Sequence, residues 1–181
     1  MVTEIRIYFE GDDALRPGFS HFFEELKTKA GARRVRLIAG GSGTEAEKDY
    51  RIALGQHPEA WNVLLRDSEG DEVPKSEDHF WMVQLMEAWF LADPEALETY
   101  YGKKNFNRNA LKKNPRIEEV PKSDVLECLK EASRESQKGP YHKTKHAPEI
   151  LQRIDPLKVR NAAPHCELLF QRLLAGLDQG R

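Results

Sequence analysis

The sequence predicts an α/β fold, a parallel sheet flanked by helices, with a helical extension toward the C-terminal end of the chain. Three observations carry this prediction. Over residues 1–65, short β-rich apolar runs alternate with helical patterns, the order typical of parallel sheets. The third apolar run contains almost no polar residue, as expected for a strand buried on both faces. From residue 122 onward the patterns are helical and punctuated by prolines.

The first strand–helix–strand unit follows from the opening residues. Residues 2–9 alternate and are rich in Val, Ile and aromatic side chains, which predicts a strand. A polar loop over 10–17 contains one Gly and one Pro. Residues 18–30 place phenylalanines and a leucine on one side of a predicted helix. The run RRVRLIA over 33–39 predicts the second strand.

A glycine-rich segment, GGSGT, joins the second strand to a predicted helix over 45–56. Thr44 and Glu47 have the spacing of a capping box. The segment itself is either a tight turn or a loop whose N–H groups bind phosphate. It lacks the Lys-Ser/Thr ending of a P-loop. The run WNVLL over 61–65 predicts the third strand.

Charged residues then interrupt the pattern before the last predicted strand. Residues 67–78 are strongly charged and contain one Pro. Residues 80–83 predict a fourth strand and residues 85–91 a helix. Asp93 is expected to cap a helix that restarts at Pro94.

The remaining chain predicts a helical extension. Residues 102–121 are rich in Lys and Asn and predict an exposed loop. The predicted helices that follow are 122–135, 145–153 and 164–176. We therefore expect an α/β core over residues 1–99 and a helical extension over 100–181, packed together as one compact domain.

Composition excludes several classes of protein. The chain has 181 residues, 39% hydrophobic and 32% charged, with a net charge of −2. This composition excludes a wholly basic nucleic-acid coat and a disordered acidic tail. Apolar runs are too short for a membrane span, and the first residues lack a signal-peptide pattern, so we expect a cytoplasmic protein. Two cysteines make no disulfide or metal framework.

Charge is distributed unevenly along the chain. Residues 1–99 carry 11 basic and 20 acidic side chains, a net charge of −9. Residues 100–181 carry 17 basic and 10 acidic side chains, a net charge of +7. This asymmetry either reflects two differing solvated faces or predicts a cation site beside a phosphate-binding surface.

Carboxylates follow two of the predicted strands. Glu10 ends the first strand, and Asp67, Glu69 and Asp71 follow the third. Right-handed crossovers place the first and third strands side by side, about 5 Å apart, with their carboxyl ends at one edge. Clustered carboxylates stay ionised together when a cation lies among them, and oxygen ligands suit Mg²⁺ or Mn²⁺. Acidic loops that merely keep strand ends hydrated are the alternative.

Glu87 is a further candidate ligand. It lies in LMEAWFLAD, where a carboxylate among so many apolar residues needs a partner or a metal. If the fourth strand ends near Gln84, Glu87 reaches the same sheet edge as Asp67. A local cap or salt bridge is the alternative.

These motifs resemble a known domain. An apolar strand ending in Glu-Gly, followed by an Asp-x-acid pair after a later strand, resembles the Toprim domain of topoisomerases, primases and nucleases of the overcoming-lysogenization-defect (OLD) type, over residues 1–93. The stretches IYFEG, LLRDSEG, MVQLMEAWFLADPEAL and YHKTKHAPEIL resemble a Toprim-like bacterial family of unknown function. Members of that family are often encoded beside an AAA or ABC-type ATPase.

The resemblance implies roles for individual residues. Glu10 would be the strand-one glutamate, a metal ligand or general acid/base, and Asp67 the first acid of the Asp-x-Asp motif. Glu69 stands where the second Asp usually stands, and its longer side chain leaves the number of metals open. Asp71 is an additional potential ligand. No topoisomerase tyrosine can be assigned, so the resemblance favours a nuclease that cleaves DNA rather than RNA, in defence against foreign DNA with a partner ATPase.

Basic residues of the extension could contact the nucleic acid. Lys143 and Lys145, in YHKTKH, are candidates to stabilise charge on a scissile or flanking phosphate. A basic stretch over residues 103–116, with aromatic residues nearby, is consistent with backbone contacts or with a soluble loop.

Three other functions remain open. A receiver-like phosphoacceptor also carries acids after its first strand and an Asp after its third, but it needs a fifth strand ending in Lys, and none is predicted. A haloacid-dehalogenase-type phosphatase places its Asp-x-Asp after the first strand, where this chain has Glu10. The third alternative is a non-catalytic subunit that binds nucleic acid or a protein partner.

Overall fold

The computed structural model describes residues 2–70 and 77–180 and confirms the α/β fold. A four-stranded parallel sheet has the order β2-β1-β3-β4. Its strands are β1 (Glu4–Phe9), β2 (Arg34–Ala39), β3 (Trp61–Asp67) and β4 (His79–Met82). The first and third strands are neighbours, as the crossover rule predicted.

The register aligns the carboxyl ends of the strands. Phe9 of β1 lies opposite Ala39 of β2 and Leu65 of β3. Asp67, the last residue of β3, lies opposite Met82, the last residue of β4. Residues that follow β1, β3 and β4 therefore start from one edge of the sheet.

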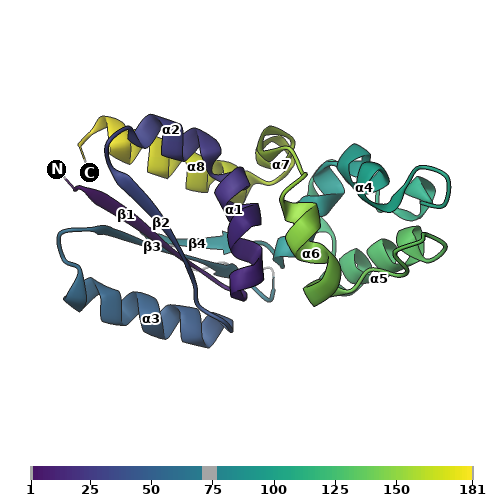
Figure 1. The fold of residues 1–181 in the computed structure, drawn as a ribbon, viewed down its shortest axis with the longest axis horizontal. Coiled ribbons are helices and arrows are strands. Elements are labelled where there is room, and N and C mark those ends of the chain that lie inside the picture. Colours follow the sequence, from purple (N-terminus) through teal and green to yellow (C-terminus); the bar gives the residue numbers. More distant parts are fainter. Residues whose placement is uncertain (1, 71–76, 181) are drawn as a thin grey trace.

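Helices flank the sheet on both faces (Figure 1). The α-helices are α1 (Arg16–Phe22), α2 (Glu24–Ala30), α3 (Gly43–Gln56), α4 (Pro94–Tyr101), α5 (Lys122–Ser133), α6 (Lys143–Leu151), α7 (Pro156–Ala162) and α8 (Pro164–Asp178). The short 3₁₀ helices are η1 (Asp13–Leu15), η2 (Met86–Ala92), η3 (Arg108–Ala110) and η4 (Ile117–Glu119). Helices α1, α2 and α8 cover one face, α3 covers the other, and α4–α7 lie beyond the end of the sheet.

The structure differs from the prediction in one helix break and in one helix N-cap. The single helix expected over 18–30 is two helices that meet at Phe23, whose backbone (φ −96°, ψ 21°) leaves the helical region. The capping box is formed by Ser42 and Glu45, not by Thr44 and Glu47. Ser42 takes the extended backbone that a cap requires, whereas Thr44 already lies inside the helix.

The connection over residues 102–121 is not the exposed loop that its composition predicted. It contains η3 and η4 and buries Phe106, Leu111, Ile117 and Val120. The Lys and Asn residues between these apolar positions made the segment polar on average, and this is why its composition predicted an exposed loop. The helix expected over 85–91 is the 3₁₀ helix η2, and α7 was not predicted.

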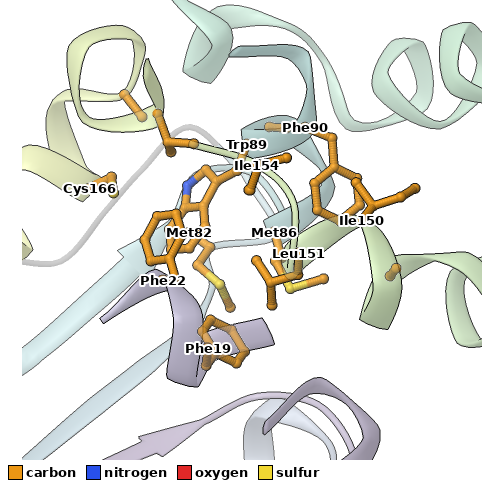
Figure 2. Packing of buried hydrophobic residues seen from close by; sticks show 14 of the residues in the cluster. Phe19, Phe22, Met82, Met86, Trp89, Phe90, Ile150, Leu151, Ile154 and Cys166 are labelled. Atoms are coloured by element: carbon orange, nitrogen blue, oxygen red, sulfur yellow. The ribbon is translucent and has the colours of Figure 1, made fainter. Parts of the chain in front are cut away.

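One hydrophobic core joins the sheet to the extension. Trp89 of η2 is fully buried and stacks on Phe22 of α1, with ring centroids 4.6 Å apart. Figure 2 shows this pair beside Met82 and Met86, with Ile150 and Leu151 of α6 in the same cluster. Trp81, Trp89 and Phe90 are all buried, and Trp89 and Phe90 belong to this core. Within the described residues, no helix is both long and apolar enough to cross a lipid bilayer.

Candidate metal centre

Three of the expected carboxylates meet at the carboxyl edge of the sheet. Glu10 directly follows β1, Asp67 ends β3, and Glu69 lies two residues further on. One carboxylate oxygen from each lies within 4.8 Å of the others. The sequence predicted this convergence, and its physical cause is the parallel pairing of β1 and β3.

The backbone on either side fixes the position of Glu10. The Glu10 N–H donates to the carbonyl of Leu65 at 2.9 Å, which extends the β1–β3 ladder to the site. Gly11 and Gly41 then exchange two backbone hydrogen bonds, of 2.7 and 2.9 Å. Gly11 has φ +131°, which a residue with a Cβ rarely adopts. These bonds hold the loop after β1 against the loop after β2.

Hydrogen bonds connect the cluster to neighbouring loops. The Asp67 N–H donates to Glu10 Oε2 at 3.0 Å, and the Met86 N–H donates to Asp67 Oδ1 at 2.8 Å. Glu69 has a left-handed backbone (φ 61°), is exposed, and forms an ion pair with Lys122 at the start of α5. Glu10 and Asp67 are therefore held by the fold, whereas Glu69 reaches the cluster from solvent.

Asp67 is buried among other carboxylates. Its side chain is 4% exposed. Burial, together with the charges of Glu10 and Glu87, raises the pKa of Asp67 to about 8, although Lys143 and the Met86 N–H act in the opposite direction. A buried carboxyl beside like charges favours its neutral form unless a cation compensates it.

Glu87 lies beside the cluster rather than within it. The side chain is fully buried, and Tyr141 donates its hydroxyl hydrogen to Glu87 Oε1 at 3.0 Å. Glu87 Oε2 is buried and has no hydrogen-bond partner within residues 2–70 and 77–180. A buried carboxylate oxygen without a partner is energetically costly.

Lys143 connects Glu87 to Asp67. Its ammonium lies 3.9 Å from Asp67 Oδ2 and 3.7 Å from Glu87 Oε1. Burial alone would lower the pKa of Lys143, but the charges of Glu87 and Asp67 raise it above the usual value. Lys143 is therefore a permanent positive charge at the edge of the site.

One predicted site residue, Lys145, is not brought to the cluster. Lys145 is exposed on α6, and in the described part of the chain no ion pair joins it to these carboxylates. Helical geometry explains this, because two residues correspond to about 200° of rotation around the axis and Lys143 faces the site. Asp71 lies outside the described residues.

Sequence reasoning missed three residues that shape the site. Lys122 pairs with Glu69, and Tyr141 binds Glu87. The third is Gly43, where a Cβ would lie 2.8 Å from Glu10 Oε2. For Gly43 the signal in the sequence was the glycine-rich segment GGSGT, and the structure shows that this glycine makes room for the Glu10 carboxylate.

Gly43→Ala should lower Mn²⁺ affinity about tenfold, the scale of changes that reposition a ligand without removing it. The new methyl group would displace the end of the flexible Glu10 side chain, so folding stability should change little. Gly55→Ala is the matched control, because it lies in the same helix and nothing is within 4 Å of its added Cβ. That control should keep wild-type affinity and gain about 0.5–1 kcal/mol of stability. Equal Mn²⁺ affinities for the two variants, measured by calorimetry, would contradict this assignment.

Much of the basic stretch over 103–116 is engaged within the protein. Arg108 pairs with Glu95 and Glu98, and Lys112 pairs with Asp124 at 3.0 Å. These ion pairs are exposed and contribute little stability, so they could be exchanged for phosphates. They nevertheless reduce the positive field that this surface presents.

The donor set fits a hard divalent cation. Every candidate ligand atom is a carboxylate oxygen, which suits Mg²⁺ or Mn²⁺ and not zinc. The raised pKa of Asp67 and the unpartnered Glu87 Oε2 are both costs that a nearby cation would reduce.

Comparison with known protein families identifies part of the chain. Residues 74–174 match DUF4276, a domain of unknown function. No curated protein and no solved structure matches the chain. The matched residues include Glu87, Tyr141 and Lys143, whereas the three clustered carboxylates precede them.

Proposed function

The chain belongs to the DUF4276 family, whose function is unknown, and from that premise we propose that it is a metal-dependent nuclease that cleaves DNA phosphodiester bonds with Mg²⁺ or Mn²⁺. One observation carries the proposal. Carboxylate oxygens of Glu10, Asp67 and Glu69, from the ends of two adjacent parallel strands, lie within 4.8 Å of one another. Hard divalent ions bound by such oxygens are suited to phosphate chemistry.

We also propose that the sheet and its carboxylates are related to the Toprim domain. Three features support it: a glutamate follows β1, an Asp-x-Glu motif lies at the end of β3, and these two strands are neighbours. All three are expected from the resemblance to the Toprim domain. Glu69 in place of a second aspartate is the departure from that pattern, and its exposed side chain pairs with Lys122.

The residues of the site have distinct roles in the proposed reaction. Glu10, Asp67 and Glu69 would hold the ion, which when bound supplies Lewis acidity and lowers the pKa of a coordinated water. Asp67 must lose its proton to bind the ion, so binding releases a proton below about pH 8. Lys143 would attract a non-bridging phosphate oxygen and offset the charge that develops during cleavage. Lys145, on the exposed face of α6, is a candidate for contact with a flanking phosphate.

The proposed biological setting is defence against foreign DNA with an AAA or ABC-type ATPase. It rests on the resemblance of the motifs. The net charge of −2 and the paired state of Arg108 and Lys112 support the need for a partner, because unaided DNA binding depends on unengaged basic side chains.

The test is a supercoiled-plasmid nicking assay with Mn²⁺, run alongside a calorimetric Mn²⁺ titration. Glu10→Gln keeps an acceptor for the Asp67 N–H but removes the charge, so nicking and Mn²⁺ affinity should each fall about 100-fold or more. Glu59→Gln, an exposed acid before the opposite end of β3, is the control and should match the wild type. Wild-type protein that binds no Mn²⁺ would refute the proposal and favour a non-catalytic binding subunit.

One observation favours a second candidate, a receiver-like phosphoacceptor. Lys143 lies 3.9 Å from Asp67, so the site pairs an aspartate after the third strand with a lysine. The lysine comes from a helix rather than from a fifth strand, and Asp67 is almost fully buried. Incubation with a radiolabelled small phosphodonor distinguishes the two functions, because only a phosphoacceptor retains label on Asp67.

A further inference from the structure

The Lys143 ammonium lies between two carboxylates at the edge of the candidate site. Lys143 Nζ is 3.9 Å from Asp67 Oδ2 and 3.7 Å from Glu87 Oε1. Asp67 also belongs to the cluster with Glu10 and Glu69. Asp67 therefore lies between two positions for positive charge, one bounded by the cluster and one filled by Lys143.

Glu87 has the features of a ligand without a metal. It is fully buried, which is rare for a carboxylate, and Tyr141 holds only one of its oxygens, at 3.0 Å. Within the described residues the other oxygen accepts no hydrogen bond. The oxygen nearest Lys143 is Oε1, so the ammonium supplies positive charge beside a fully buried carboxylate, which would be costly without it.

The charges of the site balance with one divalent ion. The carboxylates are Glu10, Asp67, Glu69 and Glu87, and the lysines paired with them are Lys122 and Lys143. With all of these groups ionised, the sum is −2, which one Mg²⁺ or Mn²⁺ neutralises. Two divalent ions would leave an excess of positive charge in a partly buried site, which is unfavourable.

We propose that Lys143 occupies the place of a second divalent ion, so that the site binds one metal beside Glu10, Asp67 and Glu69 and keeps a latent second site between Asp67 and Glu87. This inference rests on the proposed metal site and specifies its stoichiometry. The ammonium provides a fixed charge that needs no exchange with solvent, whereas the ion remains exchangeable. Removing the ammonium converts the latent position into a second Mn²⁺ site.

The experiment counts bound Mn²⁺ in four proteins by calorimetry and, independently, by electron paramagnetic resonance of free Mn²⁺. Wild-type protein should bind one Mn²⁺ per chain and Lys143→Ala two. Lys143→Arg retains the positive charge and should bind one. Lys143→Ala combined with Glu87→Gln keeps the acceptor for Tyr141, removes the charge of the latent site, and should return the count to one.

Each outcome decides between the alternatives. Two ions in the wild type, or one in Lys143→Ala, would overturn the inference while leaving the proposed metal site intact. Two ions in the double variant would show that Glu87 is not a ligand of the second site and would overturn it as well. No Mn²⁺ in the wild type would instead refute the proposed function itself. Lys143 is 55% exposed at the start of a helix, so the alanine variant should fold, and a melting curve checks this.

Discussion

Asp67→Asn should make the metal-free protein more stable at pH 8 while lowering Mn²⁺-dependent nicking about 100-fold or more. The two effects have one cause. The Asp67 carboxyl is buried near Glu10 and Glu87, so its charged form is unfavourable without a cation. Asparagine keeps an oxygen that accepts from the Met86 N–H and removes the charge that metal binding requires.

The sign of the pH dependence follows from the raised pKa of Asp67. In the unfolded chain this group titrates near its ordinary value of 3.8, whereas in the folded protein its pKa is about 8. Wild-type stability is therefore unaffected by Asp67 below about pH 4 and falls as the pH rises toward 8. Each unit of pKa displacement corresponds to about 1.4 kcal/mol, so the advantage of asparagine should reach a few kcal/mol at pH 8 and shrink toward pH 4.

Thermal unfolding in EDTA between pH 4 and pH 9 measures this difference. A chain of this size gains about 2–4 °C in Tm per kcal/mol, so we expect a difference of about 5–10 °C at pH 8. Added Mn²⁺ should stabilise the wild type and not the variant, because only the wild type binds it. A variant less stable than the wild type at pH 8 in EDTA, or a difference independent of pH, would show that burial of Asp67 is not the dominant effect.

Trp89→Ala should destabilise the whole chain by about 3–5 kcal/mol, the range for deleting a large buried aromatic side chain. Trp89 is fully buried, stacks on Phe22 at 4.6 Å and meets Phe19 edge-on at 6.5 Å (Figure 2). It comes from η2, which packs against α5, α6 and α7 of the extension. Loss of the Trp89 side chain should therefore weaken the packing between the helices on the sheet and the helices of the extension.

Calorimetric unfolding of Trp89→Ala tests whether that core is shared. One transition with Tm lowered by about 6–20 °C is expected if residues 1–99 and 100–181 unfold together. Leu157→Ala is the control, since Leu157 is 59% exposed and its loss should change stability by no more than about 0.5 kcal/mol. Two separate transitions, with only one shifted, would show that the extension unfolds independently of the sheet.

The sequence alone determined the sheet and the three carboxylates at its edge. Strand identity depends on local patterns of apolar and β-branched residues, and parallel strands necessarily place their carboxyl ends together. Once β1 and β3 were recognised as neighbours, Glu10, Asp67 and Glu69 had to lie near one another. The boundaries of the elements were determined less well by the sequence. At the start of α3, for example, Ser42 and Thr44 can both act as an N-cap, and only the structure shows that Ser42 does so.

The tertiary structure decided what surrounds those carboxylates. Tyr141 and Lys143 lie more than 50 residues from Glu87 in the chain, and only the packing of the extension against the sheet edge brings them to it. That packing depends on the burial of apolar side chains over the whole chain, so the sequence could name Lys143 as a candidate but could not place it beside Glu87. The orientation of α6 about its axis likewise places Lys143, and not Lys145, beside the carboxylates. Two residues that are two positions apart on a helix point in nearly opposite directions.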